Sequence, residues 1–404
     1  MALWGMIGGK KKERTEAVID IGSHSIKVLV FERGPAGTPP RILKKMVDRM
    51  PLGADQLRLA AQVHKFMFVL TRELGLMPGR IAIAVGPHLA DHSLVSWSAH
   101  GPKNAAEISG AALAHLFQGA VREHQEADQV VWAYPVAVSV NGYAAPRGVA
   151  GSPAPAGLAG EKVPIRFLSP SGQADGALLL FRTLVLSLSR RVADALEEAR
   201  FAWGATSITF VPLPVAYLEV AGGAGEMQDF LLIDVGGEET MLMRVRAGTL
   251  ESVRFFSPSA HEFARRITKE TGMPFREAED GLRAFVRGTG RIAGFERMRE
   301  MSAIVAVVWK EAFLACLDED YHLGPLSPVV ILTGGGAEIP EIEAAVRDSA
   351  WIKKFSYASA PAVRTLAAHS FFDGNSLGGF LGGAEDAGLA ALVKYTLRQD
   401  DLFL

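Results

Sequence analysis

The chain has 404 residues, with 42 lysines and arginines against 44 aspartates and glutamates, and 49% of its residues are hydrophobic. This length predicts two or three globular units, and a formal net charge of -2 offers no basic surface to nucleic acid, so we expect no nucleic acid partner. The single cysteine, Cys316, excludes an internal disulfide and a thiolate zinc site and is typical of a cytoplasmic protein, and the 10 histidines include no closely spaced metal-binding pair.

The first 15 residues differ in composition from the rest. Residues 1–7 are apolar and residues 10–14 are mostly basic, which is the reverse of the order in a signal peptide. Apolar side chains at the level of the lipid headgroups, followed by cations, are typical of a segment that binds anionic lipid. We therefore interpret residues 1–14 as a membrane-binding segment, with a disordered tail as the alternative interpretation.

Strand and helix patterns then alternate, which favours a mixed α/β protein. Residues 16–87 form the first part of a first half, in which we expect three strands, a helix and a buried strand at 17–20, 26–33, 41–47, 54–74 and 81–85. Residues 88–182 read as an inserted α+β subdomain. Its expected elements are strands at 94–97 and 130–140, a helix at 105–123, a loop at 146–160 and a core strand or helix at 177–188.

The alternation resumes in 183–228, the second part of the first half, with a helix at 187–204, a strand at 207–211 and a helix after Pro214. A second half is predicted for 229–370. Its strands are expected at 229–235, 240–245, 250–256 and 329–332, and its helices at 261–271, 275–286, 301–317 and from 340. Residues 371–404 provide a closing helix at 385–397.

The two halves share a motif in which a buried strand ends in aspartate and a glycine-containing turn leads into the next strand. The first copy provides Asp20, Gly22, Ser23, His24, Ser25 and Lys27, and the second provides Asp234, Gly236, Gly237 and Thr240. Backbone N–H groups of such a turn form a concave site for phosphate. We expect Asp20 and Asp234 to hold Mg²⁺ through water, and Lys27 to neutralise phosphate charge.

A third motif consists of Gly334, Gly335, Gly336 and Ala337, where a buried strand ends and a helix begins. Residues without side chains let a base or ribose lie against the backbone, and a helix N-terminus adds partial positive charge. The alternative interpretation is a turn that packs a strand closely against a helix.

In their order and separations, the three motifs resemble those of the actin-like ATPase superfamily, over essentially the whole chain from about Glu16. The resemblance implies a duplicated, ribonuclease H-like fold with two halves around a nucleotide cleft, and ATP and Mg²⁺ as cofactors. It also implies that Glu279 and Arg283 lie on the helix beside the base, and that the closing helix returns to the first half.

The segment 134–142, followed by Pro146 and Gly148, is similar to the inserted subdomain of FtsA-type bacterial cell division proteins. This resemblance implies a cytoskeletal protein that forms filaments with itself and tethers a tubulin-like division protein to the inner membrane. Its location would be cytoplasmic and peripheral on that membrane. Because the sequence ends directly after the last expected helix, we expect residues 1–14 to provide the anchor.

Two other roles stay open on the same fold. A PilM-like scaffold for type IV pilus assembly would bind a short peptide, and no feature of the sequence excludes it. A small-molecule kinase is less favoured, because no carboxylate is clearly placed as a base for an acceptor hydroxyl.

The second motif departs from the superfamily pattern where catalysis is concerned. Glu238 and Glu239 replace a glycine and a threonine, and each carboxylate would repel a phosphate charge by roughly 3 kcal/mol at ~6 Å and an effective dielectric of ~20. A metal could offset this repulsion, or the two side chains could point away from the phosphates. Val211 stands where chaperones of the superfamily have a catalytic glutamate. We therefore identify no catalytic residue and expect at most a weak ATPase.

Overall fold

A computed structural model of the chain describes residues 15–35, 38–50, 56–73, 75–101, 108–109, 115–119, 122, 129–140, 143–144, 162–163, 178–223, 228–289, 292–357, 359–372 and 379–401. The membrane-binding segment expected at 1–14 and the loop expected at 146–160 lie outside the described residues.

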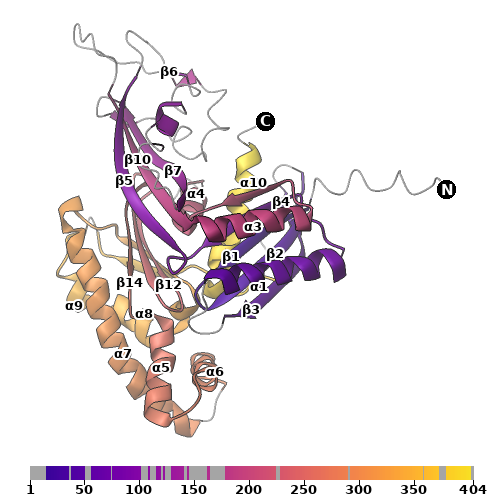
Figure 1. Cartoon of the computed structure of the whole chain (residues 1–404). Helices are drawn as coiled ribbons and strands as arrows, with labels where there is room; N and C mark the ends of the chain where they lie inside the picture. Colours follow the sequence, from indigo (N-terminus) through magenta and orange to yellow (C-terminus); the bar gives the residue numbers. More distant parts are fainter. Residues whose placement is uncertain are drawn as a thin grey trace.

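A five-stranded sheet forms the centre of the first half, in the order β11-β4-β1-β2-β3 (Figure 1). Its strands are β1 (Thr15–Ile21), β2 (Ser25–Glu32), β3 (Arg41–Arg49), β4 (Arg80–Val85) and β11 (Ser207–Phe210). The first three pair antiparallel, whereas β4 and β11 run parallel to β1. Both faces of β1 are covered, which explains its near-continuous apolar sequence.

The second half repeats this topology in a five-stranded sheet of order β14-β13-β12-β15-β16. Its strands are β12 (Phe230–Val235), β13 (Thr240–Arg246), β14 (Thr249–Phe256), β15 (Val329–Thr333) and β16 (Ala362–Thr365). Again three strands pair antiparallel, and β15 and β16 run parallel to β12. The expectation of a duplicated α/β fold is confirmed, although β16 was not among the expected strands.

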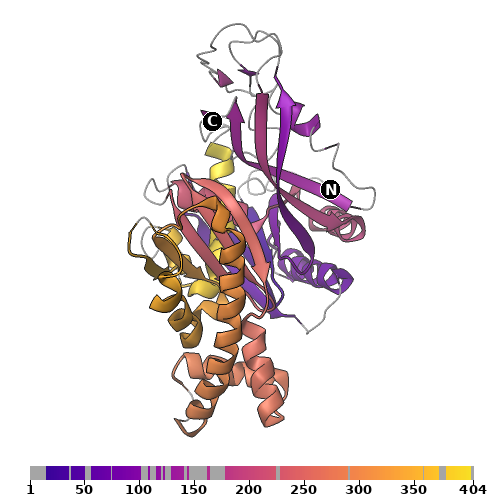
Figure 2. The same ribbon diagram turned by 90° about the vertical axis from the view of Figure 1, so that its left-hand side faces the viewer.

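Two helices lie between the sheets, α4 (Leu213–Gly223) and the closing helix α10 (Ala387–Asp401) (Figures 1 and 2). Buried residues of both sheets, such as Leu29 and Met243, pack with Leu389 and Val393 of α10 in one core. Arg33 fixes the far end of α10: it pairs with the buried carboxylate of Glu16 at 3.0 Å and donates to the carbonyl oxygens of Thr396 and Leu397 at 2.7 and 2.9 Å. The closing helix therefore returns to the first half, as expected.

The remaining helices cover the outer faces of the sheets. On the first sheet lie α1 (Gln56–Phe68), which continues into a short π-helix at Val69–Glu73, and α3 (Arg190–Trp203). The second core contains α5 (Ala260–Thr271), α6 (Phe275–Val286), α7 (Ile292–Glu319), α8 (Pro340–Val346) and α9 (Ser349–Ile352). Short 3-10 turns cover Tyr321–Leu323, Gly335–Glu338, Ala368–Phe371 and Ala384–Asp386.

A separate antiparallel sheet projects from the first half (Figures 1 and 2). It consists of β5 (Ala90–His100), β10 (Leu178–Ser189), β7 (Gln129–Val140) and β8 (Tyr143–Ala144), in that order. The helix expected at 105–123 is wrong at its start, because β6 (Ile108–Ser109) is a strand that pairs with β9 (Lys162–Val163); residues 115–119 are helical.

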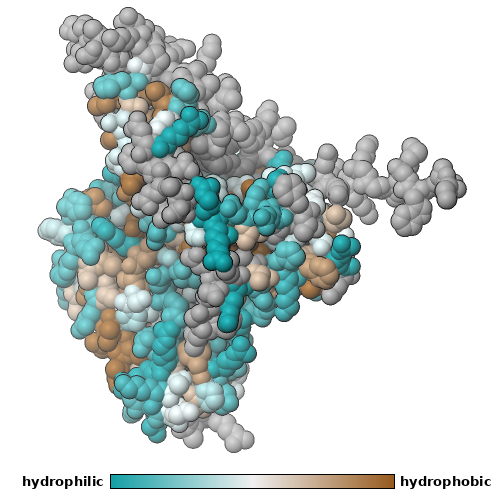
Figure 3. All heavy atoms as spheres, viewed as in Figure 1, coloured by the Kyte–Doolittle hydropathy of each residue, from teal (hydrophilic) through white to brown (hydrophobic). Residues whose placement is uncertain are grey.

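An apolar patch lies on the surface of α7, where Ile304, Val307 and Val308 are 50%, 58% and 50% exposed (brown at the lower left of Figure 3). Such a cluster is typical of a protein contact surface. Among the described helices, none has the length and apolar character that a membrane crossing requires.

Candidate functional site

Two glycine turns of the same geometry follow the central strands of the two sheets. After β1, the Gly22 N–H donates to the Ser25 carbonyl oxygen at 3.1 Å, and after β12, the Gly236 N–H donates to the Glu239 carbonyl oxygen, also at 3.1 Å. An added Cβ at Gly236 would lie 2.8 Å from that carbonyl oxygen, so the second turn requires glycine. The duplicated sequence motif is therefore a duplicated turn.

The two turns touch each other. The Glu238 N–H donates to Ser23 Oγ at 3.0 Å, and an added Cβ at Gly237 would lie 3.0 Å from the Cβ of His24. A further contact between the halves is the ion pair of Arg49 at the end of β3 with Asp280 of α6, at 2.8 Å. The two turns therefore face each other, and the halves are closed against each other.

A cavity of about 330 Å³ lies between the halves at this point, within the range of small-molecule sites. Most of the residues predicted from the sequence line it: Asp20, Gly22, Ser23, His24, Ser25, Lys27, Asp234, Gly236, Gly237, Glu279, Arg283, Gly334, Gly335 and Gly336. The structure thus brings together residues from the first, second and third motifs.

Two predicted residues lie behind the cavity wall. The Thr240 side chain is fully buried, lies 3.0 Å from Ser259 Oγ and accepts a hydrogen bond from Trp309 Nε1 at 3.1 Å. Ala337 is 2% exposed and packs in the core of the second half. Both therefore support the loops that carry them and do not border the cavity.

Asp20 and Asp234 end the equivalent strands β1 and β12 and converge on the cavity. Burial raises the pKa of Asp234 to about 6, an effect that the hydrogen bond from the Tyr217 hydroxyl (3.0 Å) opposes and the charge of Asp20 reinforces. Burial also raises the pKa of Asp20, while Lys27, whose Nζ lies 3.8 Å away, acts in the opposite direction. Two carboxylates that repel each other's charge in one site suit a divalent cation with oxygen ligands.

Glu238 and Glu239 differ in orientation. Arg265 Nη2 contacts both oxygens of Glu238 at 2.5 Å, and His261 Nδ1 lies 2.9 Å from Oε1. Partial burial opposes ionisation of Glu238, but Arg265 and His261 outweigh it and lower its pKa. Glu238 is therefore held by Arg265 and His261 and is not among the residues that line the cavity, in agreement with the alternative that its side chain points away from a phosphate.

Glu239 does border the cavity. Its Oε2 is buried, and among the described residues it has no hydrogen-bond partner. Burial and the neighbouring charge of Glu238 raise the pKa of Glu239. Of the two glutamates that follow the second turn, an anionic ligand in the cavity would thus meet Glu239 and not Glu238.

The third motif combines packing with access to the cavity. An added Cβ would lie 2.2 Å from Asp234 Oδ1 at Gly334, whose φ is +86°, and 2.4 Å from Val235 Cγ1 at Gly336. At Gly335 an added Cβ would lie 3.8 Å from the Cβ of Glu385, an ordinary van der Waals distance, so this position is less crowded. Leu282 and Arg283 of α6 line the same cavity as Gly335. The packing interpretation therefore holds for Gly334 and Gly336, and the binding of a base or ribose at this motif stays a prediction.

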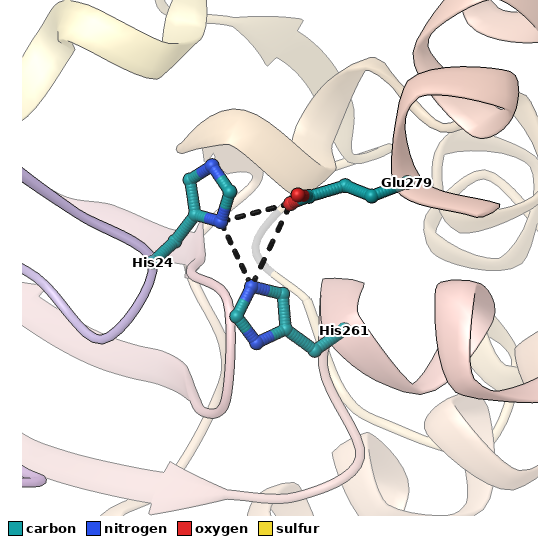
Figure 4. A group of neighbouring side chains, drawn as sticks. All are labelled: His24, His261 and Glu279. Atoms are coloured by element: carbon teal, nitrogen blue, oxygen red, sulfur yellow. Dashed lines mark hydrogen bonds and ion pairs between the residues drawn. The ribbon is translucent and has the colours of Figure 1, made fainter. Parts of the chain in front are cut away.

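Two histidines and a glutamate form a cluster that lines the cavity (Figure 4). His24 Nδ1 lies 2.9 Å from both His261 Nε2 and Glu279 Oε1, and His261 Nε2 lies 3.8 Å from the same glutamate oxygen. His261, on the first turn of α5, was not among the predicted residues. Its sequence neighbourhood gives little signal, because its partner His24 is 237 positions away.

Solved structures match the described fold over nearly the whole chain. The PilM-PilN type IV pilus biogenesis complex matches with a TM-score of 0.58 and 17% identity, over 94% of this chain and 98% of that chain. The chain has an actin-like ATPase fold. No family model and no curated protein sequence matches it.

Two other structures with an actin-like ATPase fold match less closely. The ethanolamine utilization protein EutJ from Carboxydothermus hydrogenoformans matches with a TM-score of 0.48 and 12% identity, over 94% of this chain and 89% of that chain. MreB5 of Spiroplasma citri bound to ADP matches with a TM-score of 0.47 and 11% identity, over 97% and 99% of the two chains.

Proposed function

We propose that the chain is a nucleotide-binding scaffold protein that holds Mg²⁺-ATP between its halves and hydrolyses it slowly or not at all. The convergence of both glycine turns and both strand-end aspartates on one cavity carries this proposal. Asp20 and Asp234 would hold Mg²⁺ through water, and Lys27 would neutralise phosphate charge. The base would lie in the part of the cavity that Leu282 and Arg283 of α6 and Gly335 line.

Slow hydrolysis is proposed for two reasons. Val211 is fully buried and apolar at the end of β11, so it provides no base for the attacking water. Glu239 places a negative charge beside the second turn, where the terminal phosphate of ATP would lie. A scaffold that changes shape when it binds nucleotide needs affinity for the nucleotide but does not need to hydrolyse it rapidly.

For the partner, we favour two roles that share this scaffold. The nearly full-length match with a PilM-PilN complex supports a PilM-like role in which the chain binds a short peptide of a pilus assembly protein. The sequence of β7 around Tyr134, similar to that of FtsA-type proteins, supports a division role with filaments and a tubulin-like partner.

The apolar patch on α7 supports self-assembly into filaments. Three exposed β-branched side chains, at Ile304, Val307 and Val308, would be buried if a second copy of the chain packed on this helix. Membrane attachment through residues 1–14, at the cytoplasmic face of the inner membrane, completes the proposal for the division role.

Calorimetric titration of the full chain with ATP tests the central proposal, first with Mg²⁺ and then with EDTA. We expect Mg²⁺-dependent binding that Asp20→Asn weakens at least tenfold; absence of binding in Mg²⁺ would contradict the proposal. Sedimentation with Mg²⁺-ATP then separates the two roles. A pellet that Val307→Glu abolishes supports filaments, whereas a soluble chain that retains short pilus-protein peptides on a column supports the PilM-like role.

A further inference from the structure

The cluster of His24, His261 and Glu279 joins three elements from both halves of the molecule (Figure 4). His24 belongs to the first glycine turn, His261 to α5 and Glu279 to α6. One donor atom from each, His24 Nδ1, His261 Nε2 and a Glu279 carboxylate oxygen, lies within 4.8 Å of the other two. We propose that these residues bind a divalent transition-metal ion of the Zn²⁺ type, which bridges the two halves.

The distances between the donor atoms fit a single ion. Zn²⁺ lies about 2.0–2.2 Å from histidine nitrogen and carboxylate oxygen, so the donors of a tetrahedral site are about 3.3–3.5 Å apart. The three separations here are 2.9, 2.9 and 3.8 Å and therefore bracket this value. Small side-chain rotations are enough to make them equal.

A second layer of contacts orients His261 for such a role. Its Nδ1 lies 2.9 Å from Glu238 Oε1, and Arg265 holds this glutamate in place at 2.5 Å. The ionised carboxylate accepts a hydrogen bond from the Nδ1–H of His261, so the lone pair of this imidazole is on Nε2, the atom that faces His24 and Glu279. Metal-binding histidines commonly have such a carboxylate partner, which fixes the tautomer.

The donor types also separate this site from the one at Asp20 and Asp234. Mg²⁺ requires oxygen ligands, whereas two imidazoles and one carboxylate favour Zn²⁺, Co²⁺ or Ni²⁺. Three protein ligands leave one position of a tetrahedral ion free, and all three side chains line the cavity. The open position therefore faces the cavity, where a water molecule or an anionic ligand can occupy it.

Arg283 competes with the metal in the metal-free protein. Its Nη2 donates to His24 Nε2 at 2.5 Å, so the proton of this imidazole is on Nδ1, the atom that the ion needs. Binding therefore requires Nδ1 to release its proton and Nε2 to take one up from solvent, while Arg283 turns away. Its side chain is 39% exposed and has room to do so.

Metal titration of the metal-free full chain tests this proposal, with Co²⁺ as a visible probe and Zn²⁺ as its competitor. We expect one equivalent of Co²⁺ to produce the intense visible absorption of a four-coordinate ion, and Zn²⁺ to abolish it and raise the melting temperature. His24→Gln, His261→Gln and Glu279→Gln should each remove the absorption. Glu238→Gln should weaken binding about 10- to 100-fold, and Arg283→Ala should strengthen it.

His369→Gln is the matched control, since it removes an exposed histidine outside the cluster and should leave metal affinity unchanged. Circular dichroism of each variant checks that it folds. Absence of one-to-one binding by the natural chain would overturn the proposal, as would equal affinity in the three ligand variants. The metal proposal and the nucleotide proposal can fail independently. ATP binding is measured separately, in Mg²⁺ without a transition metal.

Discussion

Ser23 Oγ and the backbone N–H of Glu238 form a hydrogen bond of 3.0 Å between the two halves of the chain. This bond joins the two glycine turns directly, so a ligand phosphate placed between them must replace it. The contact thus couples occupancy of the cavity to the separation of the halves. In terms of populations, a nucleotide shifts the molecule away from this closed arrangement if it binds an open one more tightly.

Asp234→Asn should make the protein more stable without divalent cations and should weaken its affinity for nucleotide. Burial raises the pKa of Asp234 to about 6, so this group stabilises the fold fully below the unfolded pKa of 3.8 and loses that contribution as pH rises through about 6. At pH 7, asparagine should remove a cost of up to about 3 kcal/mol while still accepting from Tyr217. We expect a higher melting temperature without divalent cations and weaker binding of Mg²⁺-ATP.

The same measurement repeated at pH 4 provides the control for Asp234→Asn, because the carboxyl group of the natural protein, with a pKa of about 6, is then almost fully protonated in the folded state and the difference in melting temperature should shrink. An equal difference at both pH values would show that the charge of Asp234 is not its origin.

Glu239→Thr should tighten ATP binding about tenfold, because it removes the one glutamate of the pair that borders the cavity. Glu262→Gln, in the first turn of α5 and outside the cavity, should have no such effect. Phosphate release, measured alongside binding, tests whether Glu239 only repels the phosphate or also acts as a base. Rapid release by the natural chain that Glu239→Gln abolishes would identify Glu239 as a base and contradict slow hydrolysis.

Glu16→Ala should destabilise the protein by about 3 kcal/mol, because it leaves Arg33 without its buried carboxylate and loosens the end of α10. The matched control is Glu32→Ala, which breaks the exposed pair with Arg41 and should cost no more than about 1 kcal/mol. Urea denaturation gives both values. Similar costs for the two variants would mean that the Glu16–Arg33 pair contributes no more than a surface pair.

Deletion of residues 1–14 should abolish co-sedimentation with anionic vesicles and leave folding and filament formation intact. Attachment by a segment with so few apolar residues is reversible, so it should become firm when a filament presents many copies. Neutral vesicles provide the control for the role of the basic residues. Equal vesicle binding by the natural and truncated chains would favour the alternative interpretation of residues 1–14, a disordered tail.

Local patterns in the sequence were sufficient for most of the fold. The apolar runs of β12 and β15 predict buried strands because both faces of these strands are covered. By contrast, β16 was missed, since it is a four-residue edge strand with mostly exposed side chains. The start of α7 at Ile292 was also missed, because the glycines at 288, 290 and 294 are typical of a loop.

For the site, the sequence predicted what depends on the backbone and missed what depends on distant side chains. The turns at Gly22 and Gly236 follow from a short motif, so their geometry was predictable. The orientation of Glu238 was not, because it depends on Arg265 and His261, which are spaced i, i+4 on one face of α5. Nor does any local pattern relate His24 to Glu279.

The return of α10 to the first half means that this half cannot complete its fold before α10 has been synthesised. Residues near both ends of the chain build one core, in which Leu29 packs with Val393, and Arg33 reaches a carbonyl oxygen 364 positions away. A growing chain on the ribosome therefore displays the inner face of its first sheet to solvent until the closing helix has emerged. Contacts of such long range slow folding and prolong the lifetime of an aggregation-prone intermediate. We therefore expect the chain to depend on chaperones while it is being translated.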